Sequence, residues 1–364
     1  MKVALVQDWL TGMRGGEKVF ERFCRRFPEA PIYTLVHVPG SVSGAIESHP
    51  IHASFVQGLP GAQKKYQRYL PLFPAAIERF DLRGYDLVLS SSHCAAKGVI
   101  VHPGTRHLCY CHTPMRYVWS SYEEYFGSGR VSGLAARVLP FVASYLRQWD
   151  QLSASRVDSF AANSAHVARR IRRYYGRDAR VIHPWVDVDF FTPEGPREDF
   201  YLVVTALVPY KRVDLVLEAA RRLDRPFVIV GDGVERERLE RNAPANVRFL
   251  GWLPEEPLRD FYRRCRALLF PGEEDFGIVP VEAQATGAPV IGLGRGGLLE
   301  TVREDERGVF FAEPTADQLC AAIERFESRG WEHAAIRDGV LSFGPTRFEA
   351  EIDRWLADEL GRSD

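Results

Sequence analysis

The chain has 364 residues, of which 46% are hydrophobic and 26% charged, a composition typical of a folded globular protein and not of a disordered one. This length exceeds what one simple core usually holds, so it predicts two domains. The formal net charge of −1 provides no overall field that would attract nucleic acid, and we expect no nucleic-acid partner.

The first half of the chain alternates between short apolar strands and amphipathic helical patterns. A helix N-cap signal, Asn163-Ser164, opens the last of these helices. The expected elements are strands over residues 3–6, 86–90, 107–110 and 159–162, and helices over 17–27 and from the cap to 175.

The same alternation restarts after a passage rich in Pro and Gly over 183–196, which predicts an interdomain linker. The expected strands are 200–206, 227–231, 247–250, 267–270, 289–293 and 308–311, and the helices 212–223, 235–241, 257–264, 277–287, 298–303 and 348–360. Alternating strands and helices predict an α/β fold of two doubly wound, Rossmann-like domains, residues 1–190 and 191–343, facing each other across a cleft.

Two glycine-rich loops are candidates for binding an anion. Gly15 and Gly16 follow Arg14 at the start of the first helix, where backbone N–H groups and the helix N-terminus favour negative charge. The run Gly292-Leu-Gly294-Arg-Gly296-Gly297 contains the G-x-G-x-x-G pattern of dinucleotide-binding loops, but it lies late in its domain, whereas that cofactor uses the first strand. Both loops are equally compatible with tight turns between a strand and a helix.

Charged side chains follow two apolar strands of the second domain. Lys211 and Arg212 come after its first strand, where two cations suit a diphosphate. Glu274 follows the strand at 267–270, and Glu282 lies on the helix that begins at Gly277, in an apolar setting where an unpaired carboxylate would be costly. Sugar hydroxyls would satisfy both carboxylates. A retaining glycosidase pair is the alternative, but it would not need the cations nearby.

The run Cys109-Tyr-Cys111-His112 matches no zinc spacing and has no second pair of ligands, so no metal is expected. The N-terminus lacks signal-peptide architecture, and no stretch approaches the roughly 18–20 apolar residues of a membrane span. We therefore expect a cytoplasmic protein. Residues 63–74, within the segment 59–80, mix Lys and Arg with aromatics, which suits peripheral contact with a membrane or, equally, aromatics packed inward.

The E-x7-E spacing of Glu274 and Glu282 resembles the signature of family GT4, the retaining glycosyltransferases with a GT-B fold. The segment from Glu274 to Glu282 is similar to the WbaZ-like branch of mannosyltransferases of O-antigen and exopolysaccharide assembly. The resemblance extends over nearly the whole chain through Gly15-Gly16, Ser90-Ser91-Ser92-His93, Cys111-His112-Thr113-Pro114, Asn163-Ser164, Pro184-Trp185-Val186-Asp187, Lys211-Arg212 and Gly296-Gly297.

This resemblance implies a role for each matching residue. Three are implied to act at the reacting centre: His112 and Glu274 contact the transferred sugar, and Lys211 contacts the diphosphate. The implied donor-binding residues are Arg14, Gly15, Gly16, Lys211, Arg212, Leu250, Gly277, Ile278, Glu282, Gly296 and Gly297, with Glu282 on the ribose and Leu250 near the base. Ala206 departs from the family, which places an Arg there. Either Arg212 or Arg14 substitutes for that Arg, or this branch of the family binds the phosphate in another way.

The resemblance also implies a function: retaining transfer of a hexose to a glycan or a polyprenyl-diphosphate-linked oligosaccharide. A lipid-linked acceptor at the inner membrane face would suit the first of the two interpretations of residues 63–74. Mannose from GDP-mannose is the first candidate donor, and UDP- and dTDP-sugars are alternatives. No cofactor or metal is implied, and the C-terminal segment of about 344–364 is implied to pack back on the first domain. A nicotinamide oxidoreductase and a non-catalytic nucleotide-sugar binder are the competing classes.

Overall fold

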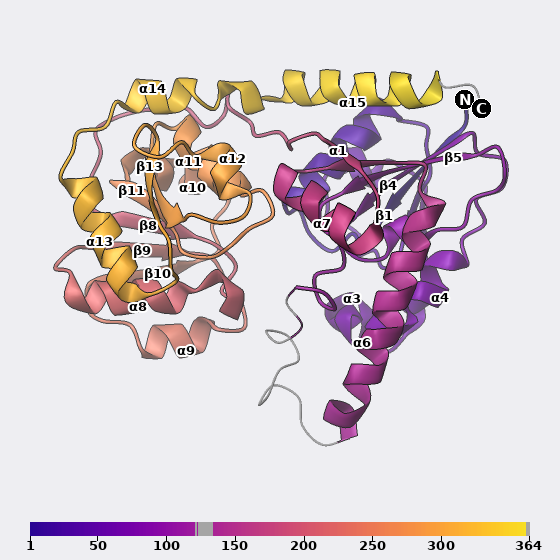
Figure 1. Cartoon of the computed structure of the whole chain (residues 1–364), viewed down its shortest axis with the longest axis horizontal. Coiled ribbons are helices and arrows are strands. Elements are labelled where there is room, and N and C mark those ends of the chain that lie inside the picture. Colours follow the sequence, from indigo (N-terminus) through magenta and orange to yellow (C-terminus); the bar gives the residue numbers. More distant parts are fainter. Residues whose placement is uncertain (121, 123–133, 362–364) are drawn as a thin grey trace. The chain divides into compact units, whose positions relative to one another are not determined.

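The computed structural model describes residues 1–120, 122 and 134–361, which divide into two compact units (Figure 1). Unit 1 comprises Met1–His183 and Glu349–Asp364, and unit 2 comprises Pro184–Phe348. The divisions fall at 183/184 and 348/349, where the sequence analysis placed them at 190/191 and 343/344. Residues 362–364, the end of the expected C-terminal segment, lie outside the described residues.

Unit 1 is built on a seven-stranded parallel sheet with the strand order β3-β2-β1-β4-β5-β6-β7. The strands are β1 (Val3–Gln7), β2 (Ile32–Thr34), β3 (Ile51–Ala53), β4 (Leu87–Ser92), β5 (Arg106–Cys111), β6 (Ser159–Ala162) and β7 (Ala179–Val181). The order reverses between β1 and β4, so the loops that follow these two strands begin side by side. Doubly wound sheets bind their ligands at this topological switch point.

The helices α2, α3 and α4 of unit 1 are short, whereas α1, α7 and above all α6 are longer (Figure 1). They are α1 (Gly15–Arg26), α2 (Gly44–Glu47), α3 (Ala62–Lys65), α4 (Phe73–Glu78), α6 (Leu134–Ser153) and α7 (Ala165–Tyr175). Helices α3, α4 and α6 contribute side chains to one core cluster, together with Ala4 and Val6 of β1.

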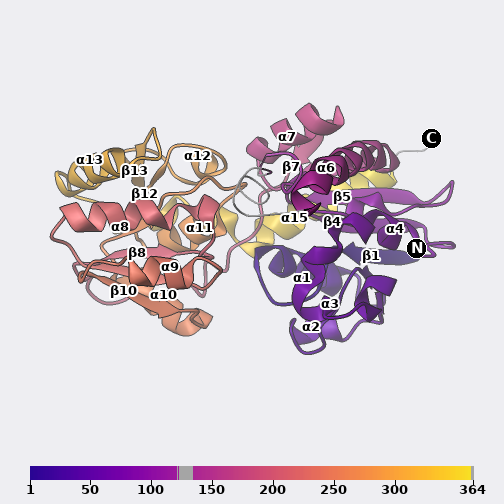
Figure 2. The same ribbon diagram turned by 90° about the horizontal axis from the view of Figure 1, so that it is seen from below.

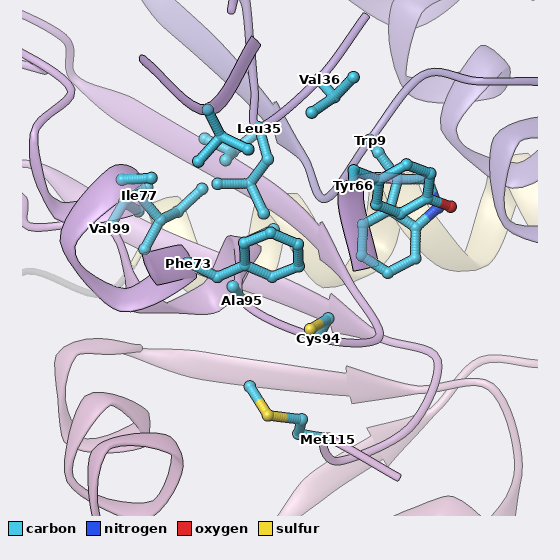
Figure 3. Packing of buried hydrophobic residues seen from close by; sticks show 14 of the residues in the cluster. Trp9, Leu35, Val36, Tyr66, Phe73, Ile77, Cys94, Ala95, Val99 and Met115 are labelled. Atoms are coloured by element: carbon cyan, nitrogen blue, oxygen red, sulfur yellow. The ribbon is translucent and has the colours of Figure 1, made fainter. Parts of the chain in front are cut away.

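The Phe73 ring lies between Ile77 and the overlapping rings of Trp9 and Tyr66, with Leu35 next to it (Figure 3). The Trp9 and Tyr66 ring centroids are 4.7 Å apart. Of the segment expected to be interfacial, Tyr66 and Phe73 are therefore buried in the core, whereas Lys64, Lys65 and Arg68 are exposed. For Tyr66 and Phe73, the alternative that the aromatic side chains of residues 63–74 pack inward is therefore correct.

Helix α15 (Pro345–Leu360) starts in unit 2 and ends in unit 1. Its unit 1 portion buries Trp355, whose indole N–H donates to the Ser159 hydroxyl at 3.0 Å. Ion pairs of 2.8 Å join its Glu349 to Arg22 and its Asp353 to Arg26. One buried aromatic ring thus fixes the helix on unit 1, and exposed ion pairs, which stabilise little, flank it.

Unit 2 repeats the topology in a six-stranded parallel sheet of order β10-β9-β8-β11-β12-β13 (Figure 2). The strands are β8 (Tyr201–Val204), β9 (Phe227–Val230), β10 (Val247–Gly251), β11 (Ala267–Phe270), β12 (Val290–Leu293) and β13 (Gly308–Phe311). The helices are α8 (Val213–Arg222), α9 (Arg236–Arg241), α10 (Glu255–Arg264), α11 (Ile278–Ala285), α12 (Leu298–Thr301), α13 (Ala316–Glu327) and α14 (His333–Asp338).

Both faces of this second sheet are covered. Tyr201 and Val203 of β8 pack against α8 and α13, and the alternate residue Leu202 packs against α10 and α11. Because every side chain of such a strand is buried, the strands appear in the sequence as continuous apolar runs. The switch point of unit 2 lies between β8 and β11.

A buried ion pair in unit 1 joins the segment after β4 to helix α6. Lys97 and Asp150 are 1% and 0% exposed, and their charged groups are 2.9 Å apart. The Lys97 ammonium also donates to the Ser153 hydroxyl at 2.7 Å. Tyr175 and Trp119 donate to the other carboxylate oxygen at 2.9 and 2.8 Å. Every charge here has a partner, which is the condition under which a buried ion pair is tolerated.

We predict that replacing Lys97 by Ala lowers the free energy of unfolding by about 3–5 kcal/mol, because Asp150 would keep a buried charge without its counter-ion. Urea unfolding followed by Trp fluorescence measures the change. Lys64→Ala, an exposed lysine of the same unit, is the control and should unfold like the wild type. Equal stability of the two variants would show that the pair does not hold α6 in place.

Candidate functional site

The two loops that flank the switch point of unit 2 carry Lys211 and Glu274. Lys211 ends a 3-10 turn, Pro209–Lys211, in the loop after β8, and Glu274 lies in the loop after β11. Their side chains form an ion pair and are only 15% and 16% exposed. The structure therefore brings these two predicted residues together at the edge where a doubly wound sheet binds its ligand.

Gly272 allows the two loops to touch. A Cβ atom placed on Gly272 would lie 2.9 Å from both Lys211 Cα and the Tyr210 carbonyl oxygen, closer than real Cβ contacts. No larger residue fits without moving the backbone that carries Lys211. A contact between two loops far apart in the chain leaves no local pattern, so this glycine could not be singled out from the sequence.

Gly296 and Gly297 pack against the Glu274 loop from the far side. The Gly297 N–H donates to the Glu274 carbonyl at 2.8 Å, and a Cβ on Gly297 would lie 2.3 Å from the Asp275 carbonyl oxygen. Gly296 has φ +67°, a left-handed conformation that favours glycine. The backbone therefore requires glycine at both positions, for close packing at Gly297 and for a positive φ at Gly296. Their loop follows β12 and not the first strand of its sheet, which argues against a dinucleotide-binding motif.

Glu282 is held by a tyrosine from the neighbouring helix. It lies on α11 and is 6% exposed, and its Oε2 accepts a hydrogen bond from the Tyr262 hydroxyl at 3.0 Å. Tyr262, on α10, is fully buried, and burial raises the pKa of its hydroxyl well above the usual value. A hydroxyl that stays protonated is a permanent donor, so Tyr262 fixes the orientation of the carboxylate.

The remaining predicted donor-binding residues of unit 2 surround this edge. Gly277, with φ +88°, caps the start of α11, and Ile278 is its first residue; Leu250 lies near the end of β10 and is half-buried. Arg212 donates to Asp214 at 3.1 and 3.0 Å. A phosphate would have to compete with Asp214 for Arg212. This ion pair argues against Arg212 as the substitute for the Arg that the family has at the position of Ala206.

Unit 1 groups its predicted residues at the carboxyl edge of its own sheet. His112 follows β5, and its Nε2 forms a 2.9 Å hydrogen bond with the buried Ser91 hydroxyl. A Cβ on Gly16 would lie 3.8 Å from the same Nε2, so the N-terminus of α1, with Gly15 and Gly16, rests against the imidazole. Arg14 is the N-cap of that helix and is exposed.

An aspartate–histidine pair lies at the β1/β4 switch point of unit 1. Asp8 is fully buried and accepts hydrogen bonds of 2.5–2.9 Å from the backbone N–H groups of residues 93–96. Its Oδ2 is 3.0 Å from His93 Nδ1. Asp8 is not among the residues expected from the sequence, and His93 is named there only within a family motif. The available signal was an Asp directly after the first strand of a doubly wound domain.

No group of three or more His, Cys, Asp or Glu side chains in the described part of the chain is arranged to hold a metal ion. Cys109 and Cys111 are buried in the core beside Phe160, and burial raises the pKa of the Cys111 thiol well above its usual value. They pack as small apolar side chains.

Two family profiles match the chain. The profile of Glycosyltransferase Family 4 matches residues 13–190, and that of Glycosyl transferases group 1 matches residues 188–338. The chain belongs to the GT-B glycosyltransferases of this group 1, family 4-like type. The GT-B fold expected from the sequence is confirmed. The matches are to the family as a whole, so the WbaZ-like branch stays a prediction.

Known relatives of this GT-B chain agree with the profiles. A D-inositol 3-phosphate glycosyltransferase of Geodermatophilus obscurus is 34% identical over 209 residues, which are 48% of this chain and 46% of that protein. The chain spans about half the length of the curated relatives it matches.

Solved GT-B structures show the same fold at low identity. A sucrose-phosphate synthase from Thermosynechococcus elongatus superposes with a TM-score of 0.72 at 17% identity, covering 100% of both chains. HepE of Anabaena, in complex with UDP, gives 0.70 at 16% identity and covers 99% of this chain and 100% of HepE.

We predict that Gly272→Ala lowers the stability of this glycosyltransferase by about 1–3 kcal/mol, because the added methyl group overlaps the backbone at 210–211. A lower melting temperature in calorimetry would report the loss. Gly330→Ala is the matched control, since a Cβ there meets nothing within 4 Å. If both variants melt like the wild type, the two switch-point loops of unit 2 do not pack as described.

Proposed function

We propose that the protein is a retaining glycosyltransferase that moves a hexose from a nucleoside diphosphate sugar to a hydroxyl group of a glycan or a lipid-linked oligosaccharide. Mannose from GDP-mannose is the first candidate donor. The observation that carries the proposal is the Lys211–Glu274 pair on the two loops that flank the switch point of unit 2. It presents a cation for the diphosphate beside a carboxylate for sugar hydroxyls.

In the proposed reaction, the sugar–phosphate bond breaks while negative charge develops on the departing diphosphate. The Lys211 ammonium stabilises that charge in a site of low exposure, where a fixed charge acts more strongly than in water. The N-terminus of α11, whose first turn carries no acidic residue, adds N–H groups and a favourable field. Because these groups supply positive charge, we propose that no metal or cofactor takes part.

The carboxylates bind and orient the donor in this mechanism, and neither acts as a nucleophile. Glu282, already fixed by Tyr262, accepts hydrogen bonds from the ribose hydroxyls. Glu274 turns from Lys211 to the transferred sugar once the diphosphate meets the lysine. His112, in unit 1, is the proposed partner of the same sugar. Holding the reactants in one geometry is the main contribution of the protein.

The names of relatives and neighbours support the donor class and widen the tests. HepE has been solved with UDP and with UDP-glucose, which makes a uridine donor the alternative to GDP-mannose. Curated relatives are named D-inositol 3-phosphate glycosyltransferases, so that polyol phosphate is a second acceptor to test. A non-catalytic binder would bind these donors without releasing the nucleoside diphosphate, and an oxidoreductase would bind nicotinamide dinucleotides.

We predict that Lys211→Ala lowers kcat at least about 100-fold, or about 3 kcal/mol, by analogy with the removal of one fixed donor from other preorganised sites. A thermal-shift panel of GDP-, UDP- and dTDP-sugars first selects the donor, and nucleoside diphosphate release gives the rate. Arg241→Ala, an exposed cation of the same unit, should keep full turnover. Wild-type turnover in Lys211→Ala contradicts the phosphate assignment, and no release from any sugar nucleotide contradicts the enzyme itself.

We further propose that the protein works at the cytoplasmic face of the inner membrane. No described helix is long and apolar enough to cross a bilayer. Helix α6, however, exposes Val138, Phe141 and Tyr145 by 48%, 77% and 49%. These residues share one stripe of the helix, at spacings of three and four. From 134 to 149 the only charged residues of α6 are arginines, at 137 and 147, which suits an anionic lipid surface.

We predict that the wild type floats with vesicles that contain phosphatidylglycerol, and that the double variant Phe141→Ser/Tyr145→Ser loses about tenfold in partitioning, because two apolar side chains no longer enter the interface. Sucrose-gradient flotation measures the bound fraction. Val234→Ser, which changes an 83% exposed apolar residue of unit 2, is the control. Wild-type protein that stays at the bottom with anionic vesicles contradicts this proposal.

A further inference from the structure

Glu274 lies in an irregular loop, residues 271–277, between the end of β11 and the start of α11. The backbone of Gly297 packs closely against this loop, since a Cβ on Gly297 would lie 2.4 Å from Phe276 Cα. Phe276 is the only aromatic residue of the loop, and it is buried, with 3% exposure. The loop is therefore anchored in the apolar core two residues after Glu274.

The ring that meets Phe276 comes from the segment between α14 and α15 (Figure 1). Phe343 ends the 3-10 turn Leu341–Phe343 and is also buried. The centroids of the two rings are 5.7 Å apart and their planes are tilted by 59°. Aromatic rings at this separation attract each other beyond the gain from burial alone. The contact thus links the Glu274 loop to a segment far along the chain.

Phe343 is held in place from both ends of unit 2. Its carbonyl oxygen accepts the N–H group of Val186 at 2.9 Å. The Arg347 guanidinium lies over its ring, 5.7 Å from the centroid, and donates to the Ser342 and Pro184 carbonyl oxygens at 3.0 and 3.2 Å. Because unit 2 comprises residues 184–348, these contacts tie its first residues to its last. The ring of Phe343 therefore offers a fixed surface to the loop.

Another buried phenylalanine of unit 2 shows what a contact of the core alone looks like. Phe326, on α13, is 3% exposed, and its ring stacks on that of Trp331 at 5.2 Å. It belongs to the apolar cluster on the opposite face of the sheet from Phe276 and Phe343. Loss of either the Phe326 or the Phe343 ring would leave a cavity and lower stability. Of these two losses, the one at Phe343 removes the contact with the Glu274 loop.

We propose that Phe343 is a positioning residue for recognition of the donor sugar, acting through Phe276 on the loop that carries Glu274; this inference rests on the proposed function. The contact keeps the Glu274 carboxylate where it meets the hydroxyl groups of the transferred sugar. Lys211, which meets the diphosphate, has a support of its own, because it ends the 3-10 turn after β8. Phe343 therefore acts on the sugar part of the donor more than on the diphosphate.

The test compares the affinity for a sugar nucleotide with the affinity for the same nucleotide without its sugar. The probes are GDP-mannose with GDP and UDP-glucose with UDP, measured by isothermal titration calorimetry. We expect Phe343→Ala to bind the sugar nucleotide about tenfold more weakly, the effect of losing about one hydrogen bond to a charged group. Its affinity for the nucleoside diphosphate should stay that of the wild type. Phe343→Leu keeps a large apolar side chain and should restore most of the lost affinity.

Phe326→Ala is the matched control, because it removes a buried ring of the same size from the same unit. Both Ala variants should melt at a lower temperature than the wild type, and the titrations are made where both are folded. A smaller folded fraction lowers the apparent affinity for the sugar nucleotide and for the nucleoside diphosphate alike. The ratio of the two affinities therefore reports on the loop, and Phe326→Ala should keep the wild-type ratio.

Hydrogen exchange of the wild type tests the same contact even if Phe343→Ala does not fold. A bound sugar would hold Glu274, and through Phe276 it would hold the turn at 341–343. GDP-mannose or UDP-glucose should therefore slow amide exchange in this turn more than GDP or UDP does. Exchange at 319–326 on α13, on the opposite face of the sheet, serves as the reference and should not differ between these ligands.

The outcomes separate the two proposals. If the wild type binds none of the four nucleotides and releases no nucleoside diphosphate, the proposed function fails, and the role of Phe343 fails with it. If the wild type binds and turns over a donor but Phe343→Ala keeps the wild-type ratio of affinities, only the role of Phe343 is overturned. Exchange at 341–343 that the sugar nucleotides slow no more than the nucleoside diphosphates also overturns it.

Discussion

The reversal of strand order in each sheet is the constraint on which the functional edges depend. In such a sheet the chain runs to opposite sides after each of the two central strands. The loops that follow these two strands therefore leave a crevice between them, where ligands bind. In unit 2 these loops bring Lys211 and Glu274 together although 62 residues separate them. In unit 1 the same reversal brings Asp8 to the segment at 93–96. In unit 2 the contact also depends on Gly272, where a larger residue would overlap the backbone at 210–211.

The α/β class and the edge that carries the site could be predicted because strands and helices of unit 2 leave strong apolar patterns. Every strand expected there appears, within a few residues of its predicted bounds. The three-residue strands β2, β3 and β7 were missed, because three residues are too few to show a period of two. The long helix α6 was missed as well, since its exposed apolar stripe blurs the contrast between a buried and a solvated face.

Some residues of the candidate site could be predicted from the sequence, and others could not. Charged residues directly after an apolar strand, such as Lys211 and Glu274, can be assigned to the ligand-binding edge from the sequence. The residue that binds a buried carboxylate cannot be assigned from the sequence. Tyr262 lies 20 residues from Glu282, on a different helix, and Asp8 lies 85 residues from His93. Only the packing of the helices and the strand order reveal which polar groups these carboxylates meet.

The carboxylates of the two edges also differ in what holds them, and this difference bears on their roles. Asp8 accepts four backbone N–H groups, which no substrate can displace without unfolding the segment, so it suits a fixed positioning role. Glu274 has a flexible lysine as its counter-ion, and a diphosphate carries more charge than the carboxylate it would replace. Under the proposed function, a diphosphate that takes Lys211 therefore releases Glu274 for the sugar, and the two parts of the donor are recognised in a coupled way.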